Sequence, residues 1–140
     1  MDIGLVPELL VTSLGESLDF WCGLCGFEIV YERPEDKFAC VGLGRSRVML
    51  DQRGAGRDWE TGPLERPYGR GVNFEVHVPA VQPLVERLRA ARWPLFLAPE
   101  VRTYRVGAEA VTVEQFLVAD PDGYLVRFQA DIATSPSDMA

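Results

Sequence analysis

The chain has few of the residues that build metal and redox centres. Its 140 residues include one histidine, His77, and three cysteines. A lone histidine supplies a single ligand, so it cannot found a zinc or iron site by itself. Cys22 and Cys25 form a CxxC, but they fall late in a helical pattern, whereas a redox pair needs a helix N-terminus to lower the thiol pKa. We therefore interpret these cysteines, together with Cys40, as core residues.

Positive charge and long apolar runs are also scarce. The net charge is −7, with 14 Lys and Arg against 21 Asp and Glu, and this balance argues against a protein that grips phosphate backbones. No apolar run approaches the roughly 18 residues of a membrane span. The first ten residues carry Asp2 where a signal peptide needs positive charge. We expect a soluble cytoplasmic protein with no nucleic-acid or membrane partner.

Acidic residues dominate the stretch before Lys37, where the only base is Arg33. Surface acid often serves solubility alone, but it also attracts positively charged ligands. A cationic small molecule is therefore a candidate partner.

The first half of the chain has the pattern of a strand, a helix and three more strands. Residues 5–11 have strand character, Ser13 is a candidate N-cap, and an apolar helical stripe continues to Gly26. Residues 53–71 are rich in Gly, Pro and charge and are interpreted as a linker. The three strand-like runs between helix and linker are FEIVYE, FACVGL and RVMLDQ.

The same order restarts after the linker. A shift of 67 positions places Glu8 on Glu75 and Leu18 on Val85, which predicts a duplicated module. The strand-like runs of this half are GVNFEVHV, PLFLA, VRTYRV, VTVEQFLVA and YLVRFQ, with a helical stripe at Val81, Leu84, Val85 and Leu88. We predict a single domain, residues 1–130, made of modules at about 5–52 and 72–129, and a disordered tail at 131–140.

A tandem βαβββ module with DPDG before its last strand resembles the vicinal oxygen chelate superfamily, which includes glyoxalase, extradiol dioxygenases and bleomycin resistance proteins. The resemblance covers residues 5–129, and its strongest matches, VPELLVTSLGESLDFWCGLCGFEIVYERPE and FLVADPDGYLVRF, look most like the bleomycin resistance branch. It implies an α+β fold in which the modules form a strongly curved mixed sheet around a concave cavity, with helices on the outer face.

Strand alternation then assigns residues to the two faces of the sheet. Asn73, Glu75 and His77 are expected to face the cavity, and the same parity places Glu8 there in the first strand.

The resemblance also indicates where a metal would be held. The ligand positions of metal-bearing members correspond here to Val6, Met49, Asn73 and Arg127, and only Asn73 could bind a divalent ion, weakly. A guanidinium about 4 Å from a doubly charged ion costs roughly 8 kcal/mol at an effective dielectric near 20. We therefore predict no metal and no cofactor. Arg127 is expected to pair with Glu75, Glu8 or Asp51, or else to contact an anionic part of a ligand.

The favoured interpretation is a metal-free binding protein without catalytic residues. The resemblance implies a homodimer whose interface cavities sequester a bulky, cationic and partly planar compound, of the bleomycin type or another cationic antibiotic. The candidate ligand-binding residues are Glu8, Met49, Asp51, Trp59, Asn73, Glu75, His77, Tyr104 and Arg127.

Two alternatives stay open. The first is a lyase, isomerase or dioxygenase of the same superfamily, with a metal held by other residues such as Glu8, Glu75, His77 and Asp51 or with acid and base chemistry by the two glutamates. The second is a protein with a degenerate cavity that serves only for interaction or dimerisation.

Overall fold

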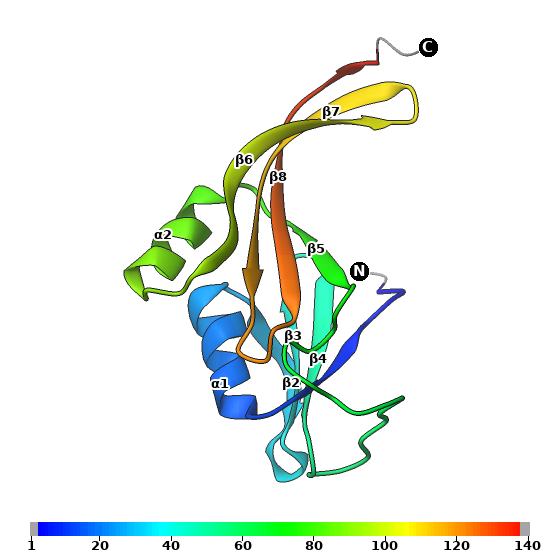
Figure 1. Ribbon diagram of the computed structural model, residues 1–140, viewed down its shortest axis with the longest axis vertical. Coiled ribbons are helices and arrows are strands. Elements are labelled where there is room, and N and C mark those ends of the chain that lie inside the picture. Colours follow the sequence, from blue (N-terminus) through cyan, green and yellow to red (C-terminus); the bar gives the residue numbers. More distant parts are fainter. Residues whose placement is uncertain (1–2, 138–140) are drawn as a thin grey trace. The chain divides into compact units, whose positions relative to one another are not determined.

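The computed structural model describes residues 3–137, which divide into two compact units. The first unit, here called the first module, comprises the chain up to Gly71 together with Asp120–Tyr124. The second module comprises Val72–Ala119 and the chain from Leu125 onward. Each contains one four-stranded mixed sheet and a helical segment (Figure 1). This architecture confirms the predicted α+β fold of tandem βαβββ modules, while their union into one domain stays a prediction.

The sheet of the first module has the strand order β1-β4-β3-β2. Strand β1 runs parallel to β4, and the other neighbours are antiparallel. The elements of this module are β1 (Glu8–Val11), α1 (Leu14–Leu18), η1 (Asp19–Leu24), β2 (Glu28–Arg33), η2 (Pro34–Asp36), β3 (Phe38–Leu43) and β4 (Ser46–Gln52).

The first helix begins and ends where its sequence signals indicate. The Ser13 hydroxyl accepts a hydrogen bond from the backbone N–H of Glu16 at 3.2 Å, as an N-cap does. The helix widens into the π-helical segment η1 and stops before Gly26, whose φ of 82° is costly for any residue with a Cβ. Phe20 and Trp21 in η1 are fully buried and form part of the core of this module.

The sheet of the second module has the equivalent order, β5-β8-β7-β6, with β5 parallel to β8. Its elements are β5 (Asn73–His77), α2 (Gln82–Ala90), β6 (Leu95–Val106), β7 (Glu109–Ala119) and β8 (Leu125–Pro136). The two runs PLFLA and VRTYRV, predicted as separate strands, form the single strand β6, whose pairing with β7 is irregular between Leu95 and Glu100.

The predicted disordered tail is wrong as far as Pro136. Strand β8 continues past residue 131 because the long strand β7 offers it a partner: Thr112 pairs with Ala133 and Glu109 with Pro136. The prediction failed because a polar segment without periodicity gives no local signal for a strand that is held by its neighbour. The next residue, Ser137, is also held, since its N–H donates to the carbonyl of Ala108 at 2.8 Å. The rest of the predicted tail, 138–140, lies outside the described residues.

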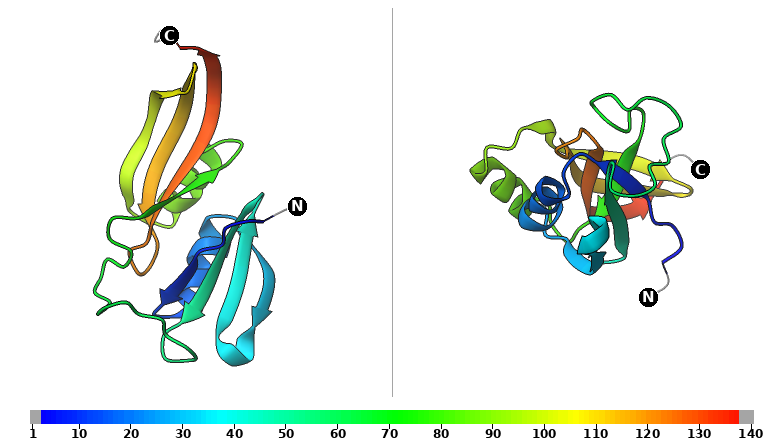
Figure 2. Two further views of the ribbon diagram at one scale, coloured as in Figure 1. Left: turned by 90° about the vertical axis from the view of Figure 1, so that its right-hand side faces the viewer. Right: turned by 90° about the horizontal axis from the view of Figure 1, so that it is seen from below.

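Alternation separates a core face from an open face in both sheets, as predicted. Leu9, Val11 and Leu50 are buried in the first module, while Glu8 and Asp51 point from the other face. In the second module Phe116 and Phe128 are buried and stack with ring centroids 5.5 Å apart. Figure 2 shows the helices of each module against one face of its own sheet.

The segment Asp120–Tyr124, which contains the DPDG turn, completes the first module although it lies late in the sequence. Asp120 is buried, and its Oδ1 accepts hydrogen bonds from the N–H groups of Asp122 and Tyr124, both at 2.9 Å. Its Oδ2 accepts one from Trp21 Nε1 at 3.3 Å. The Tyr124 hydroxyl donates to the carbonyl of Leu10 at 2.9 Å. The turn is thus bonded to both η1 and β1.

The segment 53–71, predicted to be a linker, is packed onto the first module. Arg53 forms a 2.8 Å ion pair with Glu60, and Arg66 forms a 3.1 Å ion pair with the buried Asp122. Tyr68 is buried beside these groups. Composition alone indicated a linker, because composition cannot show that arginines in this segment pair with carboxylates from elsewhere in the chain. Among residues 3–137, no helix has the length and hydropathy required to cross a membrane.

Candidate ligand-binding site

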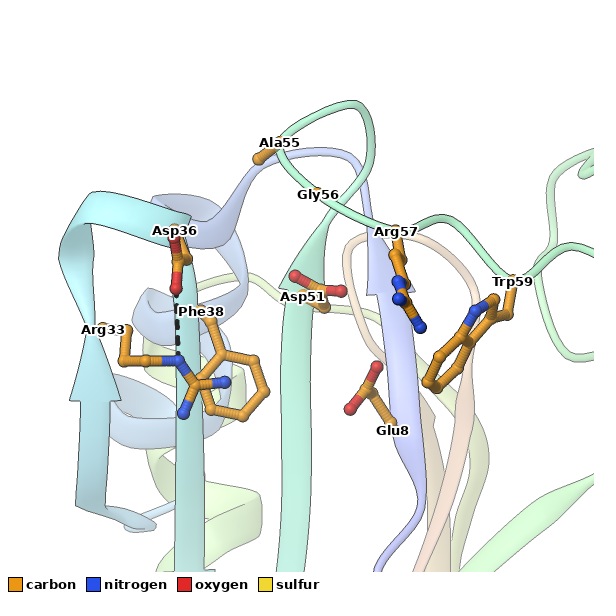
Figure 3. A pocket seen from close by; sticks show the side chains of 9 residues that line it. All are labelled: Glu8, Arg33, Asp36, Phe38, Asp51, Ala55, Gly56, Arg57 and Trp59. Carbon is orange, nitrogen blue, oxygen red and sulfur yellow. Dashed lines mark hydrogen bonds and ion pairs between the residues drawn. The ribbon is translucent and has the colours of Figure 1, made fainter.

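The open face of the first sheet carries a pocket of about 380 Å³. Strands β1, β3 and β4 form its floor, and the end of β2, the η2 turn and the loop after β4 form its rim (Figure 3). The lining residues are Glu8, Arg33, Asp36, Phe38, Asp51, Ala55, Gly56, Arg57 and Trp59.

Two carboxylates lie at the centre of this pocket. Glu8 and Leu10 are two residues apart on β1, so their side chains share one face of the sheet. Leu10 is in parallel register with Asp51 on β4, which places Asp51 on that face as well. Burial, followed by the charge of Asp51, raises the pKa of Glu8, and Arg33 opposes this. Burial also raises the pKa of Asp51, with Asp58 and Asp36 adding to the effect and Arg33 again opposing it.

The carboxylates of Glu8 and Asp51 have no hydrogen bond or ion pair within the part of the chain that the structure describes. Arg33 is engaged elsewhere, since its Nε lies 3.3 Å from Asp36 and its guanidinium lies 4.1 Å from the centroid of the Phe38 ring. The pocket therefore holds two mutually repelling carboxylates that no base contacts directly.

Trp59 stands at the rim of the same pocket. The residue is 73% exposed, and the Arg57 guanidinium lies 6.0 Å from its ring centroid. Figure 3 shows the side chains of Glu8, Asp51, Arg57 and Trp59 directed toward a common space. A large aromatic ring in such a position leaves its apolar face open to a ligand.

The open face of the second sheet carries its own pocket, of about 360 Å³. Its lining residues are Glu75, His77, Tyr104, Val106, Val111, Val113, Arg127, Gln129 and Asp131. Arg127 Nη2 lies 3.1 Å from Glu75 Oε1, and His77 Nε2 lies 3.1 Å from Glu75 Oε2. Both oxygens of the carboxylate are therefore occupied, and Glu75 is the acid with which Arg127 pairs, one of the three expected partners.

Tyr104 is also held in place in the second pocket. Its hydroxyl accepts a 2.7 Å hydrogen bond from Nε2 of the buried Gln115, which also donates to Glu100 at 3.1 Å. The ring therefore has a fixed orientation beside Val106 and Val111.

The structure sorts the predicted site residues between the two pockets. Glu8, Asp51 and Trp59 line the first pocket, and Glu75, His77, Tyr104 and Arg127 line the second. Met49 and Asn73 line neither: Met49 is half-buried in β4 and Asn73 is exposed at the start of β5. These two residues were predicted only because they align with metal-ligand positions of the superfamily. That alignment says nothing about whether their side chains line a pocket.

Six residues of the first pocket were missed, namely Arg33, Asp36, Phe38, Ala55, Gly56 and Arg57. Phe38 pairs with Asp51 in the antiparallel register of β3 and β4, so correct strand pairing would have found it. The others lie at a strand end, in a turn or in a loop, where the sequence offers no equivalent rule.

No family model and no curated protein matches the chain, but solved structures do. A virulence protein from Salmonella typhimurium has a TM-score of 0.69 at 16% identity and covers 94% of this chain and 98% of its own. A glyoxalase/bleomycin resistance protein/dioxygenase from Alicyclobacillus acidocaldarius has a TM-score of 0.62 at 15% identity, covering 94% of this chain and 92% of its own. The chain has the fold of this superfamily. A further superfamily member, from Vibrio splendidus 12B01, is 37% identical over 89% of this chain and 95% of its own, with a TM-score of 0.41.

Members of this superfamily commonly hold a metal, but the corresponding residues here do not fit one. The Val6 side chain has no donor atom, Met49 offers only a soft thioether, and Asn73 offers a single weak amide oxygen. The Arg127 guanidinium is a cation already paired with Glu75. Among the described residues no three His, Cys, Asp or Glu side chains gather in a way that could hold an ion. The donor chemistry of these positions therefore does not fit a divalent metal ion.

Proposed function

We propose that this protein is a metal-free binding protein that sequesters a bulky, cationic and partly planar small molecule in the first pocket. The observation that carries the proposal is the pair Glu8 and Asp51, which face the pocket with no base in contact and with pKa values raised by burial and repulsion. A cationic group placed between them would relieve the repulsion and donate charge-assisted hydrogen bonds to both carboxylates.

The aromatic side chains of the pocket support a planar part in the ligand. Trp59 is exposed at the rim and Phe38 lies in the lining. Stacking on a flat ring would remove apolar surface of Trp59 from water, and a cation near the indole face would gain further attraction.

A homodimer is part of this proposal. The edge strand β2 is exposed along its whole length and carries Ile29, Val30 and Tyr31. An open edge strand with apolar side chains is a surface that another chain can cover. Size-exclusion chromatography with light scattering tests this: we expect a dimer at micromolar concentration, and a monomer would contradict it.

Calorimetric titration tests the binding proposal with metal-free bleomycin, the planar cation ethidium and the non-planar cation spermidine. We expect the two planar compounds to bind, with an affinity that falls as salt rises, and to raise the melting temperature by mass action. Glu8→Gln and Trp59→Ala should each weaken binding, whereas the matched variant Glu75→Gln in the second module should not. Equal loss from Glu8→Gln and Glu75→Gln, or no binding of either planar cation, would contradict the proposal.

Elemental analysis separates the binding protein from the metal enzyme of the same fold. Protein purified without chelator should contain no stoichiometric transition metal. One bound ion per chain would show that residues other than those at the four aligned positions form a metal site, and sequestration would then be the wrong function.

A further inference from the structure

The second pocket has chemistry of its own that the proposed function does not use. Three valines and Tyr104 form an apolar wall, and Glu75, His77 and Arg127 form a polar floor. Arg127 and His77 occupy the two oxygens of Glu75. In contrast with the first pocket, the central carboxylate here is already neutralised.

One of the positions at which the two pockets differ lies directly beside the shared glutamate of the internal repeat. Glu8 is paired in register with Met49 on β4, and Glu75 is paired in register with Arg127 on β8. The parallel pairing places the two side chains of each pair next to one another on the open face. Where the first module has an uncharged thioether beside its glutamate, the second has a guanidinium.

We propose that Arg127 determines the charge class of the second pocket, and that this pocket is a second binding site that takes an uncharged planar compound with hydrogen-bonding polar groups. A charged ligand would have to give up its hydration and compete with the Arg127–Glu75 ion pair at 3.1 Å. An uncharged ring would instead bury its apolar surface against the valines and share hydrogen bonds with the floor.

The other charged group of the pocket does not change this expectation. Asp131 lies on the exposed part of β8, where water and salt screen its charge. Glu75 and Arg127 are only partly exposed, at 39% and 29% of their side chains, so their charges count for more at the pocket floor.

Three probes of one shape and three charges test the proposal: benzamide, benzamidine and benzoate. Titrations of the full-length protein are followed by nuclear magnetic resonance, with the methyl groups of Val111 and Val113 reporting on the second pocket and the Trp59 indole reporting on the first. We expect benzamide to bind at the valines about tenfold more tightly than either ion, as the loss of one charge-assisted hydrogen bond would give.

Two variants break the ion pair from opposite sides. Arg127→Met places in the second module the residue that the first module has, and should shift the preference at the valines to benzamidine by about tenfold. Glu75→Gln leaves Arg127 unpaired and should shift it toward benzoate. Arg127→Lys keeps the positive charge and should keep the preference for benzamide. Thermal unfolding of each variant verifies that it is folded.

Failure of this inference can be told apart from failure of the cation-binding proposal, because the valine methyl groups report on the second pocket and the Trp59 indole reports on the first. Wild-type valine signals that respond to benzamidine or benzoate as strongly as to benzamide would overturn the inference, and so would an unchanged order of the three probes in both Arg127→Met and Glu75→Gln. A silent Trp59 indole would count against the first pocket only.

Discussion

The two modules place a glutamate at the same point of the same parallel strand pair but surround it differently. Glu75 in the second module is bonded by Arg127 and His77. Glu8 in the first module lies beside Met49 and repels Asp51, which raises its pKa together with burial. A duplicated backbone thus carries one glutamate that a guanidinium neutralises and one that a neighbouring carboxylate repels.

The modules also differ in how they are completed. The second module takes all its residues from the chain after Gly71, whereas the first takes its Asp120–Tyr124 turn from that later half of the sequence. The buried Asp120 and Asp122 accept hydrogen bonds from Trp21, Thr12 and Arg66 in the first module. The first module therefore depends on residues that a cut between the two sequence repeats would remove.

The largest effect is expected from Asp120→Ala. The variant leaves three donors, two backbone N–H groups and the Trp21 indole, without their acceptor. Unpaired buried donors of this kind cost on the order of 3 kcal/mol in total. Urea denaturation measures the free energy of unfolding, and Glu109→Ala, an exposed residue of β7, should change it by less than about 0.5 kcal/mol. Equal losses from both would show that the turn does not stabilise the fold.

The next effect is the pH dependence of stability. Burial raises the pKa of Asp120 from 3.8 to about 6, against the opposing effect of its backbone and Trp21 hydrogen bonds. The folded state therefore holds this proton more tightly than the unfolded chain, so its contribution to stability is complete below the ordinary pKa and is lost as pH rises through about 6. The raised pKa values of Glu8 and Asp51 act in the same direction.

Denaturation of wild type and Asp120→Asn at about pH 4.5 and about pH 7 isolates the contribution of this carboxyl, which is on the order of 2 kcal/mol. The wild type should lose more stability than the variant between these two values. Identical pH dependence of the two proteins would show that Asp120 does not carry the effect.

A smaller effect is expected on ligand affinity in the first module. Glu8→Gln removes one of the two uncompensated charges and should weaken a planar cation by about tenfold, or about 1.4 kcal/mol. Met49→Arg introduces the residue found in the second module, and the new guanidinium should pair with Glu8 and weaken the cation by a similar factor. Isothermal titration measures both, and an unchanged affinity in Met49→Arg would refute the equivalence of positions 49 and 127.

The smallest effect is expected on the stability of the second module. Arg127→Met breaks a partly exposed ion pair, which is worth about 0.5 to 1 kcal/mol. Thermal unfolding at low and high salt measures this loss, which should shrink as salt screens the charges. A loss several times larger would show that Arg127 has a structural role beyond the pair with Glu75.

Much of the fold could be predicted because it follows from local pattern. The Ser13 cap, the Gly26 stop and the alternation of β1 and β5 are each set by residues a few positions apart. The repeat offset that placed Glu8 on Glu75 is confirmed by equivalent parallel registers in the two sheets.

Other features could not be predicted because they depend on residues distant in the sequence. Arg66 meets Asp122 across 56 positions, and this contact turns an apparent linker into a packed loop. Arg33 and Arg57 enter the first pocket from a strand end and a loop, where spacing says nothing about direction. The extension of β8 to Pro136 required the length of β7 as a partner.

By itself the sequence determined that the chain is a duplicated α+β module with acidic side chains on the open face of its first strands, since periodicity and charge are properties of neighbouring residues. Only the tertiary structure decided which charges are neutralised. That depends on whether a base from another strand comes within about 4 Å of a carboxylate, where its Coulomb attraction matters. Arg127 does so for Glu75, and Met49 leaves Glu8 without such a partner.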